Sequence, residues 1–75
     1  MHKEVSILVD VPKLRGAIAE AGYSQAAVAR ALGITPQGFV KKMQRCDFKT
    51  SEAEQMIQLL DIKDPIAIFF PALRA

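Results

Sequence analysis

The sequence predicts a small all-α domain of five helices, preceded by a short β-strand or extended arm within residues 1–11. Three observations predict this fold. Apolar residues recur at helical spacing in five segments, and a capping residue or a proline precedes each segment. Only residues 5–11 combine β-branched side chains with a period of two. At 75 residues with 51% hydrophobic content, the chain has the size and composition of one folded domain, residues 1–75.

The expected strand is the segment VSILVDV. Its branched side chains share one face: Val5, Ile7, Val9 and Val11. A lone strand leaves its backbone N–H and C=O groups without partners. Two arrangements would solve this: antiparallel pairing with the same segment of a second copy, or packing as an arm on its own domain.

The first helix is expected to begin near Pro12, because the fixed φ of proline suits a first helical turn. Asp10 or Val11 precedes it in the cap position, and Gly22 ends it where a left-handed backbone is needed. Its apolar stripe consists of Leu14, Ala17, Ile18 and Ala21.

The second helix is expected over residues 25–32. With the turn and the helix that follow it, this helix has the pattern of a helix-turn-helix. Ser24 is its expected cap. Ala29 is small enough to let the next helix approach, and Gly33 supplies the positive φ of a tight turn. Ile34 then follows as an inward-pointing plug.

The third helix, expected over residues 35–45, has the strongest start signal in the chain. The hydroxyl of Thr35 accepts a hydrogen bond from a free backbone N–H, and Pro36 suits the first helical position. Phe39 and Met43 lie one turn apart, so their face belongs to the core, and Val40 is expected beside them.

The segment CDFKT, residues 46–50, is expected to be a connector. A fourth helix then runs from about Ser51 to Leu60, capped by Thr50 or Ser51. Glu52 and Glu54 suit its first turn, because carboxylates are favourable at the positive end of the helix dipole.

Asp64 and Pro65 indicate the start of a short fifth helix that ends before Pro71. Phe69 and Phe70 would cover the open side of the core, but two adjacent side chains cannot both point inward. The one that is left outside is available for an interface with a second copy.

Positive charge is concentrated on one segment. Between Arg30 and Lys49 the chain has five basic residues against Asp47 alone, a net charge of +4. The remaining residues have five basic and seven acidic groups, a net charge of −2. This clustering favours a nucleic-acid partner more than the overall charge does.

These residues resemble the Cro/repressor-type (XRE-type) helix-turn-helix family, particularly its small phage-borne members. The resemblance rests on LRGAIAEAGYSQAAVARALGITPQGFVKKM, on Asp47 and Phe48, on EAEQMIQLLDI and on the closing IFF. It covers about residues 12–70. It implies a five-helix, λ-repressor-like domain, a helix-turn-helix at residues 24–45 and a recognition helix at residues 35–45.

Three of the DNA contacts that the resemblance implies are to phosphate. Gln25 matches a phosphate-contacting position, and the N-terminus of the second helix reinforces that contact. Lys42 and Arg45 match positions that hold phosphate.

The remaining implied contacts lie at base edges. Thr35, Gln37 and Gly38 match positions that face the bases, and Lys41 matches one that reaches base or backbone. A glutamine can bind adenine with two hydrogen bonds, and a lysine can reach guanine. Pro36 and Gly38 replace longer polar side chains common in the family, so DNA shape is expected to contribute to recognition.

The sequence therefore predicts a DNA-binding transcriptional regulator of phage or mobile-element origin that recognises specific sequences of double-stranded DNA as a homodimer. The dimer would form through Val5–Val11 or the Phe69–Phe70 region. The alternative is a protein-interaction module of the same fold, such as an antitoxin or an inhibitor of a host regulator.

Other functions are not expected from this sequence. No histidine is paired with serine or cysteine, no glycine-rich phosphate loop is present, and Glu52 and Glu54 do not face one another on a helix, so an enzyme is not predicted. Cys46 and His2 are too few for a zinc site, and no cofactor or small-molecule ligand is expected. The single cysteine fits the reducing cytoplasm, and no apolar run is long enough to span a membrane.

Overall fold

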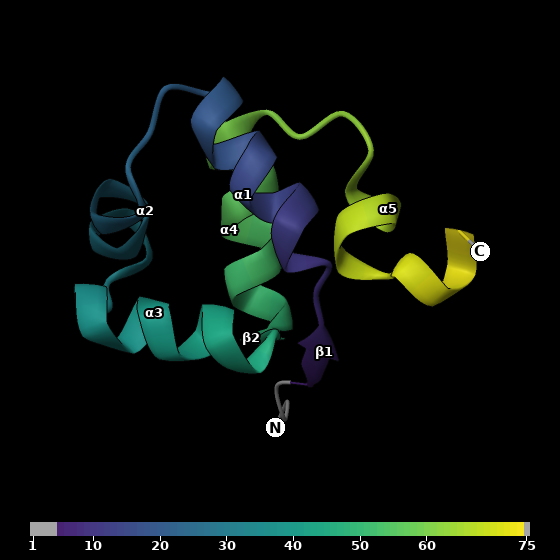
Figure 1. Ribbon diagram of the computed structural model, residues 1–75, viewed down its shortest axis with the longest axis horizontal. Helices are drawn as coiled ribbons and strands as arrows, with labels where there is room; N and C mark the ends of the chain where they lie inside the picture. The colour runs from purple at the N-terminus through teal and green to yellow at the C-terminus, as the bar shows by residue number, and fades with distance from the viewer. Residues whose placement is uncertain (1–4, 75) are drawn as a thin grey trace.

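The computed structural model describes residues 5–74. Within these residues, five α-helices surround one core, and two short strands pair to form a small sheet (Figure 1). The elements in order are β1 (Ser6–Leu8), α1 (Val11–Glu20), α2 (Gln25–Leu32), α3 (Pro36–Arg45), β2 (Asp47–Lys49), α4 (Thr50–Leu60), α5 (Pro65–Phe69) and a 3₁₀ helix, η1 (Pro71–Arg74). Helices α1 and α4 form the centre, with α2 and α3 on one side and α5 on the other. The five expected helices are confirmed.

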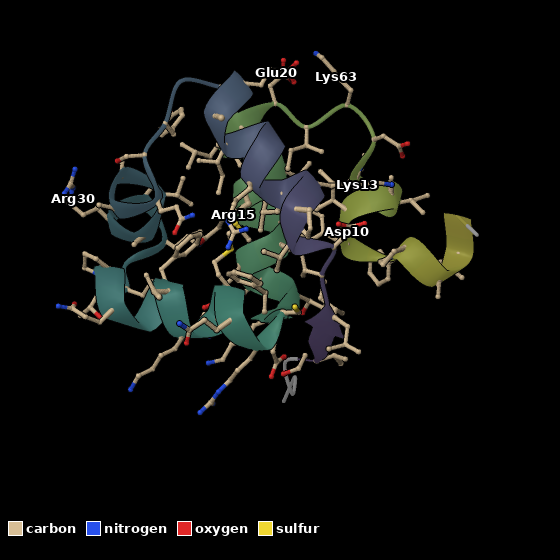
Figure 2. The ribbon with its side chains drawn as sticks, viewed as in Figure 1. Asp10, Lys13, Arg15, Glu20, Arg30 and Lys63 are labelled. Carbon is tan, nitrogen blue, oxygen red and sulfur yellow. The ribbon has the colours of Figure 1, made fainter. Side chains whose placement is uncertain are left out.

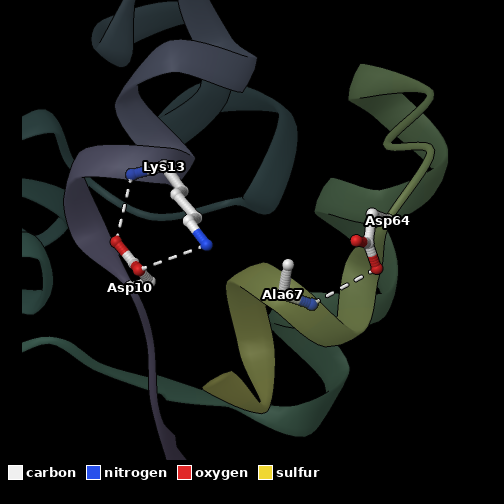
Figure 3. A network of polar contacts seen from close by, with 4 residues as sticks. All are labelled: Asp10, Lys13, Asp64 and Ala67. Carbon is white, nitrogen blue, oxygen red and sulfur yellow. Dashed lines mark hydrogen bonds and ion pairs between the residues drawn. The ribbon is translucent and has the colours of Figure 1, made fainter. Parts of the chain in front are cut away.

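Aspartate caps begin two of these helices, as the sequence predicts. Asp10 Oδ1 accepts a hydrogen bond from the Lys13 backbone N–H at 3.2 Å, so Asp10, and not Val11, is the cap of α1. Asp64 Oδ1 accepts from the Ala67 N–H at 3.4 Å at the start of α5. Figure 3 shows the two caps side by side, with the Lys13 side chain extending back to the Asp10 carboxylate. Each cap satisfies a backbone donor that has no partner within its helix.

The N-terminal strand finds its partner within the chain. β1 pairs antiparallel with β2, with Ile7 opposite Phe48, and the pairing extends to a hydrogen bond from Val9 N to Cys46 O of 2.9 Å. The prediction that CDFKT is a connector is therefore wrong for its central residues. Of the two arrangements considered for this segment, the structure has the one in which it lies on its own domain, and β2, which begins two residues after the end of α3, supplies the strand partner.

The core draws on all five α-helices, on Val9 after β1 and on Phe48 of β2. Its largest fully buried side chains are Leu14, Val28, Phe39, Phe48, Met56 and Phe69. The rings of Phe39 and Phe48 pack at a centroid distance of 5.6 Å and a tilt of 59°. This aromatic pair joins α3 to β2, and it fixes the rotation of α3 about its own axis.

Two other expectations concern residues at the edge of the core. Phe69 is 1% exposed and Phe70 is 45% exposed, which confirms that only one of the two rings points inward. The expected cap of α4 is wrong: Thr50 and Ser51 lie inside the helix, and Lys49 occupies the cap position. Within residues 5–74, no helix has the length and apolar character needed to cross a membrane.

Candidate nucleic-acid interface

The turn between α2 and α3 has the geometry that its sequence predicts. Gly33 adopts a φ of +77°, a left-handed conformation that glycine reaches without steric cost. Ile34 N donates to Ala29 O at 3.0 Å and so closes the end of α2. Ala29 is fully buried, and Ile34 is half-buried against the core. The turn therefore holds α3 at a fixed angle to α2.

Helix α3 begins with a cap that also shapes the site. Thr35 Oγ1 accepts a hydrogen bond from Gly38 N at 3.0 Å. A Cβ atom at Gly38 would lie 3.1 Å from that same oxygen, so a glycine here leaves room for the cap. The Thr35 side chain is exposed, and its hydroxyl hydrogen remains available to donate to a base or a phosphate.

The outer face of α3 is defined here by six exposed residues: Pro36, Gln37, Val40, Lys41, Gln44 and Arg45. Phe39 and Met43 hold the opposite face in the core, at 0% and 4% exposure. The first five of the outer residues line an open hollow on the helix surface. An exposed helix with polar, donor-rich side chains and a fixed rotation has the form needed to enter a major groove.

Sequence reasoning missed two residues of this face. Val40 was expected beside the core, but it is 43% exposed. Gln44 is not among the contacts predicted from the sequence, and it lies exposed on the same face. A signal for Gln44 was present, because it follows Gln37 and Lys41 at a spacing of i, i+4, i+7, which places the three on one side of a helix.

Two cations of the outer face are free of carboxylates. Lys41 and Arg45 are exposed and have no ion-pair partner within residues 5–74. Elsewhere, Lys13 Nζ lies 4.0 Å from Asp10 Oδ2, and Lys63 Nζ lies 2.8 Å from Asp61 Oδ2. The hydrogen bond and the charge of Asp61 raise the pKa of Lys63. In Figure 2 nitrogen-tipped side chains extend from α3 away from the other helices. The unneutralised positive charge of α3 therefore faces solvent, where it can attract phosphate.

Lys42 differs from its neighbour Lys41. Its Nζ lies 3.2 Å from Glu52 Oε2, and its side chain is only 25% exposed. Glu52 Oε1 accepts the Lys49 backbone N–H at 2.9 Å, which supports the start of α4. The predicted phosphate contact of Lys42 thus competes with an ion pair to Glu52, whose side chain is 10% exposed.

The first turn of α2 contains the remaining predicted contact. Gln25 is the first residue of this helix and is half-buried. The Ser24 hydroxyl accepts from Ala27 N at 3.0 Å, and the N–H groups of Gln25 and Ala26 precede it at the helix end. These N–H groups and the helix dipole favour an anion. Arg30 lies exposed further along α2 (Figure 2).

Among residues 5–74, no three His, Cys, Asp or Glu side chains come together in a way that would hold a metal ion. Cys46 is half-buried and free of a disulfide. It occupies the left-handed position that ends α3, with a φ of +56°. His2, the other soft ligand in the sequence, lies outside the described residues.

Comparison with known proteins supports the helix-turn-helix. Residues 9–45 match the family model of the bacterial regulatory proteins of the Fis family, just under half of the chain. The matched segment contains α1, α2 and the whole of α3. No curated protein and no solved structure gave a significant match. The chain contains a DNA-binding helix-turn-helix domain of the kind found in bacterial regulators.

Proposed function

We propose that this protein is a transcriptional regulator of the Cro/repressor type, which binds specific sequences of double-stranded DNA with α3 in the major groove. One observation supports this most. The outer face of α3 presents two amide and two cationic side chains, Gln37, Gln44, Lys41 and Arg45. The helix itself contains no Asp or Glu. A face that combines hydrogen-bonding side chains with uncompensated positive charge suits base edges flanked by phosphates.

Each predicted contact has a role in this arrangement. Gln37 and Lys41 read base edges, with Thr35 and the backbone at Gly38 close to the groove wall. Arg45 at one end and Gln25 with the N-terminus of α2 at the other hold phosphates. Lys42 contributes less than Lys41, because Glu52 neutralises part of its charge.

We also propose that the regulator is a homodimer, because two-fold related helices read two half-sites about one helical turn apart. Exposed apolar side chains remain in both of the expected regions. Val5 and Leu8 are 60% and 72% exposed at β1, and Phe70 and Leu73 are 45% and 76% exposed at the C-terminal end.

Sedimentation velocity measures the oligomeric state of the protein. A Phe70→Ser variant tests the C-terminal region in this assay, and a Leu8→Ser variant tests β1. A monomer at all concentrations would contradict the dimer.

The test of DNA binding is selection from a pool of randomised duplexes, followed by sequencing of the bound fraction at moderate salt. Enrichment of a palindrome with half-sites about 10 base pairs apart is the expected result. The matched control is the Lys41→Ala/Arg45→Ala protein, whose helical circular dichroism should equal that of the parent. No enrichment by a folded protein would contradict the proposal and favour the alternative, a protein-interaction module of this fold.

A further inference from the structure

We propose that the hollow on the outer face of α3 receives the 5-methyl group of a thymine, and that Val40 is a specificity-determining residue of the interface. The inference rests on the proposed function, because it assumes that this face enters the major groove. It goes further in naming the chemical group that the hollow selects.

The first argument is the chemistry of the hollow. It is lined by Pro36, Gln37, Val40, Lys41 and Gln44. Pro36 and Val40 lie one turn apart and give it an apolar floor, and Val40 is 43% exposed although its neighbour Phe39 is fully buried. Among the groups that a base pair presents in the major groove, the thymine methyl is the apolar one.

The second argument is the polar rim. Gln37 and Gln44 flank Val40 on the same face, and each amide can both donate and accept. That pattern matches the N6 and N7 groups of adenine. A hollow that takes a methyl group beside amides suited to adenine fits a step of A·T pairs.

The third argument is charge, which selects DNA over an apolar protein segment as the occupant. The rim includes the Lys41 ammonium, and Arg45 lies one turn further along. No carboxylate belongs to this helix. The positive charge complements phosphates on both sides of a groove, whereas an apolar helix from a partner would leave this charge uncompensated.

The experiment removes the methyl group and leaves every base-pairing contact in place. The probe is the duplex enriched from the randomised pool, with each thymine replaced in turn by deoxyuridine. One thymine in each half-site should lose about fourfold in affinity on replacement, the value expected for one buried methyl group. At that position, 5-methylcytosine should bind more tightly than cytosine by a similar factor.

Two matched variants assign the effect to Val40. In Val40→Ala the ratio of thymine to deoxyuridine affinity should fall to about one. In Ile66→Ala, which removes a similarly exposed branched side chain (42%) from α5, the ratio should stay at the parental value. The dissociation constants are measured by fluorescence anisotropy at one salt concentration.

The possible outcomes are distinct. A parental protein that binds its selected duplex but does not distinguish thymine from deoxyuridine would overturn the inference and leave the proposed function intact. Discrimination that survives in Val40→Ala would also overturn it. Binding to no duplex would overturn both, since the inference rests on the proposed function.

Discussion

The two adjacent lysines of α3 should behave differently when their charge is removed. Lys42→Met and Lys41→Met delete the ammonium group but keep a straight side chain with good helix propensity. Of these two lysines, Lys42 alone contacts a carboxylate within residues 5–74, with 3.2 Å between its Nζ and Glu52 Oε2. The pair of substitutions therefore isolates that contact from general effects of charge on this helix.

The expected loss of stability depends on how deeply the Lys42–Glu52 ion pair is buried. Removing one partner of a fully buried ion pair costs about 3–5 kcal/mol, and an exposed pair contributes about 0–1 kcal/mol. The side chains of Lys42 and Glu52 are 25% and 10% exposed, between these limits. We expect Lys42→Met to lower the free energy of unfolding by about 1–3 kcal/mol, and Lys41→Met to change it by less than about 0.5 kcal/mol.

Urea denaturation followed by far-ultraviolet circular dichroism measures this difference, and an unchanged m value ensures that the comparison is valid. For a domain of this size the expected loss corresponds to a decrease in Tm of about 4–24 °C. Adding Glu52→Gln to Lys42→Met should recover part of the loss, because the unpaired carboxylate is then gone. Equal losses in Lys41→Met and Lys42→Met would refute the argument that Glu52 holds Lys42.

Four further predictions concern the interface, the turn between α2 and α3, and helix α1. Gln37→Ala should relax the preference at one base position by about 1–3 kcal/mol, seen by repeating the pool selection, and should leave the salt dependence unchanged. Arg45→Ala should weaken binding to all duplexes alike and reduce the slope of log K against log salt by about 0.9 per site; a change in base preference would contradict a phosphate role. Gly33→Ala should destabilise the domain by about 1–2 kcal/mol, because an alanine is strained at a φ of +77°. Gly16→Ala, at an open helical position, should stabilise it by about 0.5–1 kcal/mol in the same urea assay.

The local signals of this sequence predict its helices well. Ser24 and Thr35 cap the second and third helices, and Gly33 takes the left-handed turn, because each depends on atoms within three or four residues. Asp64 starts the last helix for the same reason. The expected start of α4 is within one residue of the observed one, but the expected cap is wrong, since support for this end comes from Glu52 reaching back to the Lys49 backbone and not from a hydroxyl.

The features that could not be predicted depend on contacts between segments distant in sequence. β2 is only three residues long, and its pairing with β1 joins residues more than thirty-five positions apart. The sequence predicts that Val40 lies beside the core residues Phe39 and Met43. The packing of Phe39 on Phe48 decides the rotation of the helix, and this rotation leaves Val40 outside.

The rotation of α3 also gives Lys41 and Lys42 different electrostatic environments. Along the sequence, Lys41 and Lys42 are equivalent members of a basic cluster, but one residue corresponds to a turn of about 100° around the helix. That turn directs Lys42 toward Glu52 and leaves Lys41 in solvent. Helix α3 then offers two uncompensated cations, Lys41 and Arg45, which account for a salt slope of about −1.8 per protomer if both contact phosphate. A slope this modest leaves non-specific binding weak, so tight binding to the selected sequence must depend on the base contacts that the outer face of α3 makes, those of Gln37 and Lys41 and the apolar contact of Val40.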